Sequence, residues 1–133
     1  MSQENVEIAR QGYEALNRDG VDGALQFLDR EIEFVPIPDG LPDAEHFHGH
    51  DGVRTWFKKI GEVFVILGWE PREYIDAGDQ LVVEVTIRGR FKATDIPGQL
   101  AYYQVWTIRN GRAVHLEAYL DRSQALEAVG LSE

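Results

Sequence analysis

Apolar residues recur at helical spacing at the start of the chain. Val6, Ala9, Tyr13 and Leu16 are three or four positions apart, which places them on one face of a helix. Gly20 follows as a stop signal, because glycine is common just beyond the C-terminus of a helix. The pattern therefore predicts an N-terminal amphipathic helix that buries one face.

Two further helices and a strand are predicted before residue 69. A short helix begins near Asp22, and residues 31–36 form a strand that ends in the breaker-rich run 36–42. Asp51 can cap a third helix, because its carboxylate can accept hydrogen bonds from the free N–H groups of the first turn. The apolar side of this helix carries Val53, Trp56, Phe57, Ile60 and Phe64.

From Trp69 onward the apolar period changes to two, which is typical of strands with one buried face. Strands are predicted over residues 69–76, 80–92, 99–109 and 112–121, and a final helix over 123–129. Asn110-Gly111 indicates a tight hairpin turn between the last two strands. Helices that precede a four-stranded antiparallel meander must cover one face of it, so the order predicts an α+β fold.

Length and composition are those of one globular domain, which we expect to span residues 1–133. Apolar residues make up 44% of the chain and charged residues 27%, which argues against disorder. The chain has no cysteine, so disulfides, thiolate nucleophiles and thiolate metal sites are excluded. Its 13 glycines form no GxGxxG or GxxxxGK pattern, so no cradle for nucleotide phosphates is expected.

Acidic residues outnumber basic residues by 23 to 13, and the formal net charge is −10. A nucleic acid or an anionic membrane surface needs a basic face, so neither is an expected partner. The polar, acidic N-terminus is unlike a signal peptide, and the longest apolar run, 63–67, is too short to span a bilayer. A cytoplasmic location is expected.

The order of the elements and four stretches of sequence resemble the SnoaL-like branch of the nuclear-transport-factor-2-like superfamily, which also contains ketosteroid isomerases. The stretches are 13–20, 49–54, 105–112 and 119–122. The resemblance implies a cone-shaped α+β barrel, in which a strongly bent, mostly antiparallel sheet wraps around three N-terminal helices and leaves a pocket at its open end. It also implies a homodimer formed through the outer face of the sheet, a small apolar or aromatic ligand, and no cofactor.

Known members include polyketide cyclases, ketosteroid isomerases, limonene epoxide hydrolases, dehydratases and pocketed proteins without known chemistry. The resemblance places Val35 at the position of the isomerase base and Gln104 at that of its neutral aspartic acid. Without the base, isomerisation lacks a proton acceptor, although the Gln104 amide could still donate to an oxyanion. Thr86, Arg88 and Ala118 fall where epoxide hydrolases carry an Asp-Arg-Asp relay, so that relay is incomplete.

The cyclase branch uses an acid at the end of the last strand, and Asp121 resembles it. Strand alternation turns Leu116, Ala118 and Leu120 into the pocket, so Asp121 reaches the pocket only if the strand bends at its end. Glu33 of the first strand is a second carboxylate candidate. The candidate catalytic residues are Asp121, Glu33 and Gln104.

One face of the strand over 99–109 is expected to form a pocket wall. Alternation puts Tyr102, Gln104 and Trp106 on this face, and the resemblance turns the face inward. Trp56 and Phe57 are expected beside it, although large aromatic residues can equally be plain core. The expected ligand contacts are Tyr13, Trp56, Phe57, Glu84, Arg88, Tyr102, Trp106, Leu116, Ala118 and Leu120.

The strand over 80–92 presents two different faces. Glu84 and Arg88 share one face, where they form either a structural ion pair or an acid/base group with a shifted pKa. Val83, Val85 and Ile87 lie on the other face, which we expect to be exposed and to offer apolar area to a second subunit.

His46, His48 and His50 alternate just before the third helix. In an extended segment this spacing would bring the imidazoles to one side, where a zinc site is conceivable. The family uses this segment as a loop without metal, so no metal is expected. The alternative is a histidine at the pocket lip that acts as an acid or base.

Two functions stay open. The first is a cofactor-independent cyclase, isomerase or dehydratase that uses carboxylate acid–base chemistry on an apolar carbonyl compound. The second is a module that only binds a ligand or a partner. A pocket-facing carboxyl group with a strongly raised pKa would favour the enzyme, and acids confined to the surface or to ion pairs would favour the binding module.

Overall fold

The computed structural model describes residues 2–36 and 46–132 of the chain. Its helices are α1 (Ser2–Asp19), α2 (Val21–Leu25), α3 (Gly49–Gly61) and α4 (Arg122–Ala128). Its strands are β1 (Leu28–Val35), β2 (Phe47–His48), β3 (Phe64–Ala77), β4 (Gln80–Phe91), β5 (Pro97–Arg109) and β6 (Arg112–Tyr119). Three helices precede the long strands, so the expected α+β order is confirmed.

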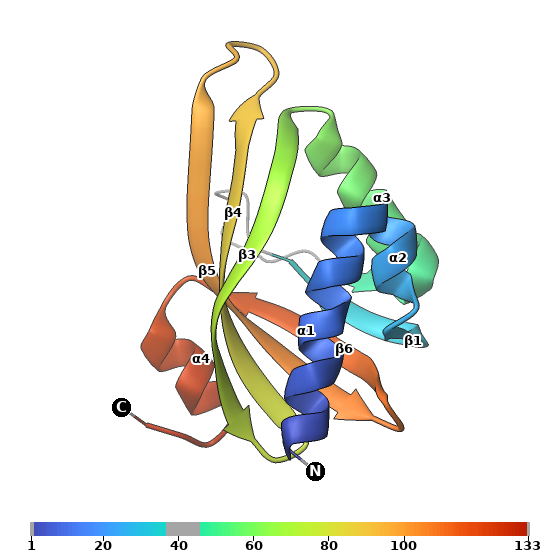
Figure 1. The fold of residues 1–133 in the computed structure, drawn as a ribbon, viewed down its shortest axis with the longest axis vertical. Coiled ribbons are helices and arrows are strands. Elements are labelled where there is room, and N and C mark those ends of the chain that lie inside the picture. The colour runs from blue at the N-terminus through green and yellow to red at the C-terminus, as the bar shows by residue number, and fades with distance from the viewer. Residues whose placement is uncertain (1, 37–45, 133) are drawn as a thin grey trace.

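The strands form one sheet in the order β2-β1-β6-β5-β4-β3. Neighbouring strands are antiparallel except for β1 and β6, which pair in parallel. The predicted meander, β3 to β6, is therefore confirmed. The sheet bends strongly but does not close, because β2 and β3 are free edges (Figure 1). The expected strongly bent, mostly antiparallel sheet is confirmed, and it is open rather than closed into a barrel.

The two faces of the sheet are covered by different helices. Helices α1, α2 and α3 lie on one side and α4 lies on the other (Figure 1). The larger core fills the side of α1 to α3 and includes Tyr13, Leu81 and Trp106. A smaller core lies under α4, where Leu126 packs with Val82. The sheet is therefore the central layer, and its inner face is the one turned toward α1.

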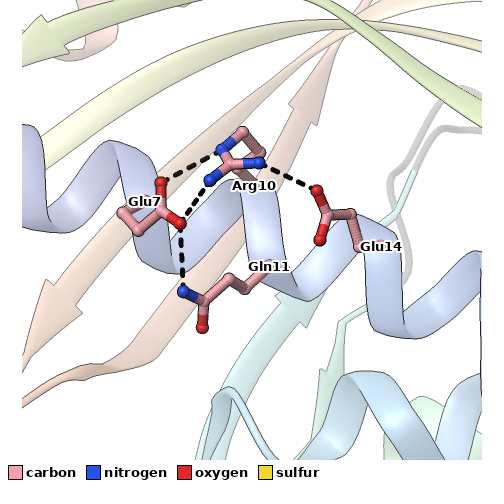
Figure 2. Close-up of polar contacts among 4 residues, drawn as sticks. All are labelled: Glu7, Arg10, Gln11 and Glu14. Carbon is pink, nitrogen blue, oxygen red and sulfur yellow. Dashed lines mark hydrogen bonds and ion pairs between the residues drawn. The ribbon is translucent and has the colours of Figure 1, made fainter.

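The outer face of α1 carries the polar residues that its periodicity requires. Arg10 pairs with Glu7 and with Glu14, and Gln11 donates to Glu7 (Figure 2). These side chains are three or four residues apart, the spacing at which neighbours meet on a helix surface. They are exposed, so the network supports the helix locally and leaves the opposite face free to pack on the sheet.

Strand β3 begins earlier than the sequence predicts. It starts at Phe64 and not at Trp69, so Phe64 belongs to this strand and not to the third helix, which ends at Gly61. A short apolar run such as 63–67 fits a helix or a strand equally well by periodicity, and only pairing with β4 decides. Phe64 lies opposite Phe91 in that ladder.

Val83, Val85 and Ile87 do not face solvent, so the expectation of an exposed apolar face on β4 is wrong. All three are buried in the main core. Val83 lies opposite Gln104 and Val85 opposite Tyr102, both on the inner face. The face that was expected to attract a second subunit is the one that α1 covers.

Apolar side chains remain exposed at the far end of the sheet, where the β4–β5 hairpin projects beyond the helices (Figure 1). These residues are Val63, Leu67, Phe91, Ile96 and Leu100. None of the helices in the described ranges combines the length and the apolarity needed to cross a membrane.

Candidate functional site

A cavity lies between the inner face of the sheet and helices α1 and α3. It is lined by Gly12, Tyr13, Leu16, Ala24, Leu28, Phe34, Pro36, Val53, Trp56, Phe57, Trp69, Tyr102, Gln104, Trp106, Leu116 and Ala118. No charged side chain is among these lining residues, and all three tryptophans of the chain are. The volume of this cavity is about 50 Å³.

Aromatic rings in edge-to-face or tilted contact build one wall of the cavity. The Trp56 ring stands 5.1 Å from Phe57 and 5.5 Å from Phe34, both nearly perpendicular. Trp69 of β3 joins them, with its ring centre 5.9 Å from that of Phe57 and 6.5 Å from that of Trp56. Such pairs have preferred geometries, so the wall has a defined shape.

Strand β5 supplies the opposite wall and its polar groups. Tyr102, Gln104 and Trp106 alternate along the strand and face the cavity. Gln104 lies opposite Val83 of β4 and Ala118 of β6, so it stands in the middle of the sheet. Only 7% of Gln104 is exposed. A buried amide of this kind must find partners or lose free energy.

A chain of hydrogen bonds orients the Gln104 amide. The indole N–H of Trp106 donates to the Tyr13 hydroxyl (3.0 Å), and that hydroxyl donates to Oε1 of Gln104 (2.5 Å). An indole nitrogen can only donate, so the Tyr13 oxygen is an acceptor there and its own proton goes to Gln104. Oε1 is thereby used, and the NH₂ group of Gln104 is left to donate elsewhere.

The Gln104 NH₂ group and the Tyr102 hydroxyl have no hydrogen-bond partner within the described residues. Among the described residues, the Tyr74 hydroxyl is the one side-chain polar atom that has neither a partner nor solvent-accessible surface. The two cavity groups are not in this class, so they retain accessible surface. Burial raises the pKa of Tyr102 well above its ordinary value, and burial likewise raises the pKa of Tyr13. Both phenols are therefore neutral donors at physiological pH.

Two candidate carboxylates lie outside the cavity, and the expected placement of Glu33 inside it is wrong. Ile32 and Phe34 of β1 are buried, so alternation turns Glu33 outward, where it is exposed. Asp121 is also exposed and caps helix α4, because its Oδ1 accepts from the backbone N–H of Ser123 (3.0 Å). Neither residue is among those that line the cavity.

Glu84, Arg88 and Leu120 do not line the cavity either, contrary to the sequence-based expectation. Glu84 and Arg88 alternate with inward-facing valines and therefore lie on the outer face of β4. Arg88 pairs with Glu70 at 2.8 Å and not with Glu84. Leu120 follows the end of β6 and is exposed. The other predicted contacts, Tyr13, Trp56, Phe57, Tyr102, Trp106, Leu116 and Ala118, lie in the cavity wall.

The three histidines point to different partners. His48 lies on strand β2 with Nδ1 2.7 Å from Glu33 and Nε2 2.6 Å from Glu31. His50 donates through Nε2 to the carbonyl of Leu28 (3.0 Å), and His46 is exposed. No cluster of His, Asp or Glu suited to a metal ion occurs in residues 2–36 and 46–132.

Several wall residues were missed by sequence reasoning, above all Trp69 and Gly12. Trp69 marks the start of the predicted strand, and its inward direction depends on a bulge that no pattern signals. Gly12 lies where a Cβ would come 3.1 Å from the Trp106 ring, so a larger residue there would crowd that ring. The helical spacing from Val6 to Leu16 gave no reason to single out this position.

The bent open sheet, its three inner helices and the uncharged cavity between them define the class of nuclear-transport-factor-2-like pocket proteins. Residues 9–116 match the model of the SnoaL-like domain. The chain belongs to the SnoaL-like domain family. A comparison with curated protein sequences found no significant match.

Solved structures with this fold cover nearly the whole chain. One is an NTF2-like protein of unknown function from Burkholderia pseudomallei K96243, with 27% identity, a TM-score of 0.77, and coverage of 96% of this chain and 98% of that chain. Another is TerC co-crystallised with polyporic acid, with 24% identity, a TM-score of 0.77, and coverage of 95% and 98%. A protein from Mesorhizobium loti proposed to be a SnoaL-like polyketide cyclase has 21% identity, a TM-score of 0.67, and coverage of 86% and 97%.

Proposed function

We propose that this protein binds a small apolar molecule that carries an aromatic or otherwise flat ring and an oxygen acceptor at one end. The observation that carries the proposal is the uncharged cavity walled by aromatic rings, with one oriented amide in its wall. Ligand sites are usually apolar surfaces with a few fixed polar groups, which is the composition found here.

The polar end of the cavity favours an oxygen acceptor. The NH₂ group of Gln104 can only donate, and the Tyr102 hydroxyl has a proton to give. A carbonyl or ether oxygen could accept a hydrogen bond from either donor. An ammonium group would find no carboxylate among the lining residues to offset the loss of its hydration.

The enclosed volume limits the size of the bound group. Pockets for drug-sized ligands have about 300–1,000 Å³, and this cavity has about 50 Å³. A single ring that enters through the open mouth fits this space better than a fused ring system. A larger ligand requires that a wall residue moves.

A cofactor-independent cyclase, isomerase or dehydratase is the second candidate function. It is favoured by the oriented Gln104 amide, since a positioned donor can stabilise an enolate oxygen. Carboxylate acid–base chemistry is poorly supported, because neither Asp121 nor Glu33 lines the cavity. Asp39, Asp43 and Glu45 lie outside the described residues.

Binding can be tested with acetophenone and ethylbenzene, two molecules of similar size that differ in the carbonyl group. Trp56, Trp69 and Trp106 all line the cavity, so intrinsic fluorescence reports occupancy. We expect acetophenone to bind more tightly, by about three- to tenfold, the worth of one hydrogen bond. Gln104→Leu should abolish this preference, and Gln124→Leu on the exposed side of α4 should keep it. The proposal is refuted if neither acetophenone nor ethylbenzene binds.

The enzyme candidate is tested by proton exchange on the same ketone. An enzyme that forms an enolate would catalyse deuterium uptake at the methyl group of acetophenone in D₂O, which NMR detects. We expect no uptake above the buffer rate. If the protein catalyses deuterium uptake, and the uptake is lost in Gln104→Leu and retained in Gln124→Leu, the enzyme is the correct function and the binding protein is not.

A further inference from the structure

The cavity is open at the end of the sheet from which the β4–β5 hairpin projects (Figure 1). On β5, Ile108 lies beyond one end of the cavity wall and is buried, whereas Leu100 lies beyond the other end and is 43% exposed. Strand β6 shows the same order, because Ala113 near its start is buried and Leu120 just beyond its end is exposed. The open side of the cavity is therefore the Tyr102 end of this wall.

The inner face of the sheet continues beyond this opening as an apolar surface. Leu100 lies opposite Ile87, and Ile87 lies opposite Trp69, which lines the cavity. This row of the sheet therefore borders the cavity wall directly. Alternation from Ile87 places Gly89 and Phe91 of β4 on the same inner face.

The ring of Phe64 lies over the next part of this inner face. A Cβ on Gly89 would come 2.5 Å from the Phe64 ring, and a Cβ on Gly98 would come 3.1 Å from it. Phe64 packs against the main core, and its ring centre is 5.1 Å from that of Phe91. Two glycines thus leave the space that the Phe64 ring fills. We call the side chains of Phe64, Ile87, Phe91 and Leu100 the apolar shelf.

The apolar shelf carries no charge, in contrast to the other face of the same hairpin. Arg88 and Arg90 alternate with the shelf residues on β4, so they lie on the outer face, where each forms an ion pair with an acid. Phe91 and Leu100 of the shelf are 49% and 43% exposed. Water therefore covers apolar surface beside the cavity, and an apolar group that replaced this water would gain free energy.

We propose that the ligand carries an apolar chain, which leaves the cavity at its open side and lies on the apolar shelf. The cavity has about 50 Å³, which leaves no room for such a chain beside the ring. Gln104 lies deeper than Tyr102 along β5, so a ring whose oxygen meets Gln104 points its opposite end toward Tyr102 and the shelf. No wall residue has to move.

The class of ligand is therefore an aryl ketone with an alkyl chain in the para position, or a compound of the same shape. The inference rests on the proposed function, because it takes the ring of the ligand to lie in the cavity.

A series of 4-alkylacetophenones with methyl, butyl and octyl chains tests the shelf, with tryptophan fluorescence as the readout. We expect the octyl compound to bind at least about tenfold more tightly than the butyl compound, since each methylene removed from water contributes up to about fourfold. Leu100→Ser should reduce this ratio at least about threefold. Leu131→Ser is the matched control and should keep the ratio, because Leu131 is also exposed but follows α4 on the other side of the sheet (Figure 1).

NMR locates the chain without any substitution. We expect nuclear Overhauser effects between the terminal methyl group of bound 4-octylacetophenone and the ring protons of Phe64 and Phe91. Contacts of this methyl group elsewhere, or a ratio that Leu100→Ser leaves unchanged, would overturn the inference. If 4-methylacetophenone binds and the octyl chain adds no affinity, the shelf inference falls and the proposed function stands. If none of the three ketones binds, both fall.

Discussion

Tyr13 connects two buried groups that otherwise have no partner. It accepts from Trp106 and donates to Gln104, and its own ring packs edge-on against Trp106 with the centroids 5.5 Å apart. The direction of these two hydrogen bonds fixes the Gln104 amide, because its oxygen accepts from Tyr13. Its NH₂ group is therefore the part that can donate to a ligand.

Removal of the Tyr13 hydroxyl should therefore destabilise the fold. Tyr13→Phe leaves the indole N–H of Trp106 and the Gln104 oxygen unpaired, which should lower the free energy of unfolding by about 1–3 kcal/mol. Urea denaturation measures this change. Tyr103→Phe is the control, since Tyr103 sits on the outer face beside α4. An equal effect of both substitutions would contradict the hydrogen-bond chain.

His48 is predicted to titrate above the usual range. Its hydrogen bonds, first to Glu33 and then to Glu31, raise the pKa of His48 because they favour the imidazolium. A raised pKa in the folded state means that the contribution to stability is full below the unfolded-state value of about 6.5 and is lost as the pH rises through the folded-state pKa. NMR titration should show this, and Glu33→Gln should lower the pKa. A pKa of His48 below 6.5 would contradict the contacts.

At the scale of the elements, helix α4 depends on its first turn. Asp121 caps this seven-residue helix, which packs Ala125 and Leu126 against Val82 and Val105 of the sheet. Asp121→Ala should lower the free energy of unfolding by about 0.5–2 kcal/mol, and Asp121→Ser should restore most of the loss because serine is also a good cap. Thermal unfolding distinguishes them. Equal loss in both variants would point to another role for Asp121.

The close approach of β3 to β4 depends on Gly89. A Cβ at this position would lie 2.0 Å from the Val65 carbonyl oxygen, so β3 and β4 could not keep their spacing. Gly89→Ala should cost at least about 1–3 kcal/mol of stability. Gly61→Ala at the end of α3 is the control, because its Cβ would meet nothing within 4 Å. Undiminished stability of Gly89→Ala would show that the strands can separate locally.

At the scale of the whole molecule, the homodimer implied by the family resemblance stays a prediction. The apolar face of β4 cannot support it, because α1 covers that face. Exposed apolar residues gather instead at the hairpin end, Phe91 and Ile96 among them. Sedimentation at several concentrations should show a dimer if the prediction holds. A monomer at all concentrations would refute it.

The placement of the candidate site followed from the sequence only in part. Alternation put Gln104 on one face of β5 with Tyr102 and Trp106, and the family resemblance predicted that this face turns inward. The outward direction of Glu33 could also have been read from Ile32 and Phe34 on either side of it, which are apolar. Trp69 could not be placed, because the bulges beside it shift the alternation and only pairing creates them.

By itself, the sequence determined the order of helices and strands, the antiparallel meander and the acidic surface, because spacing, turn residues and charge are local properties. Tertiary structure alone decided the parallel pairing of β1 with β6, the face toward which each carboxylate turns, and the size of the cavity. These depend on contacts between residues far apart in the chain. The alternation of a strand says which side chains share a face, and the helices packed on the sheet decide which face is inside.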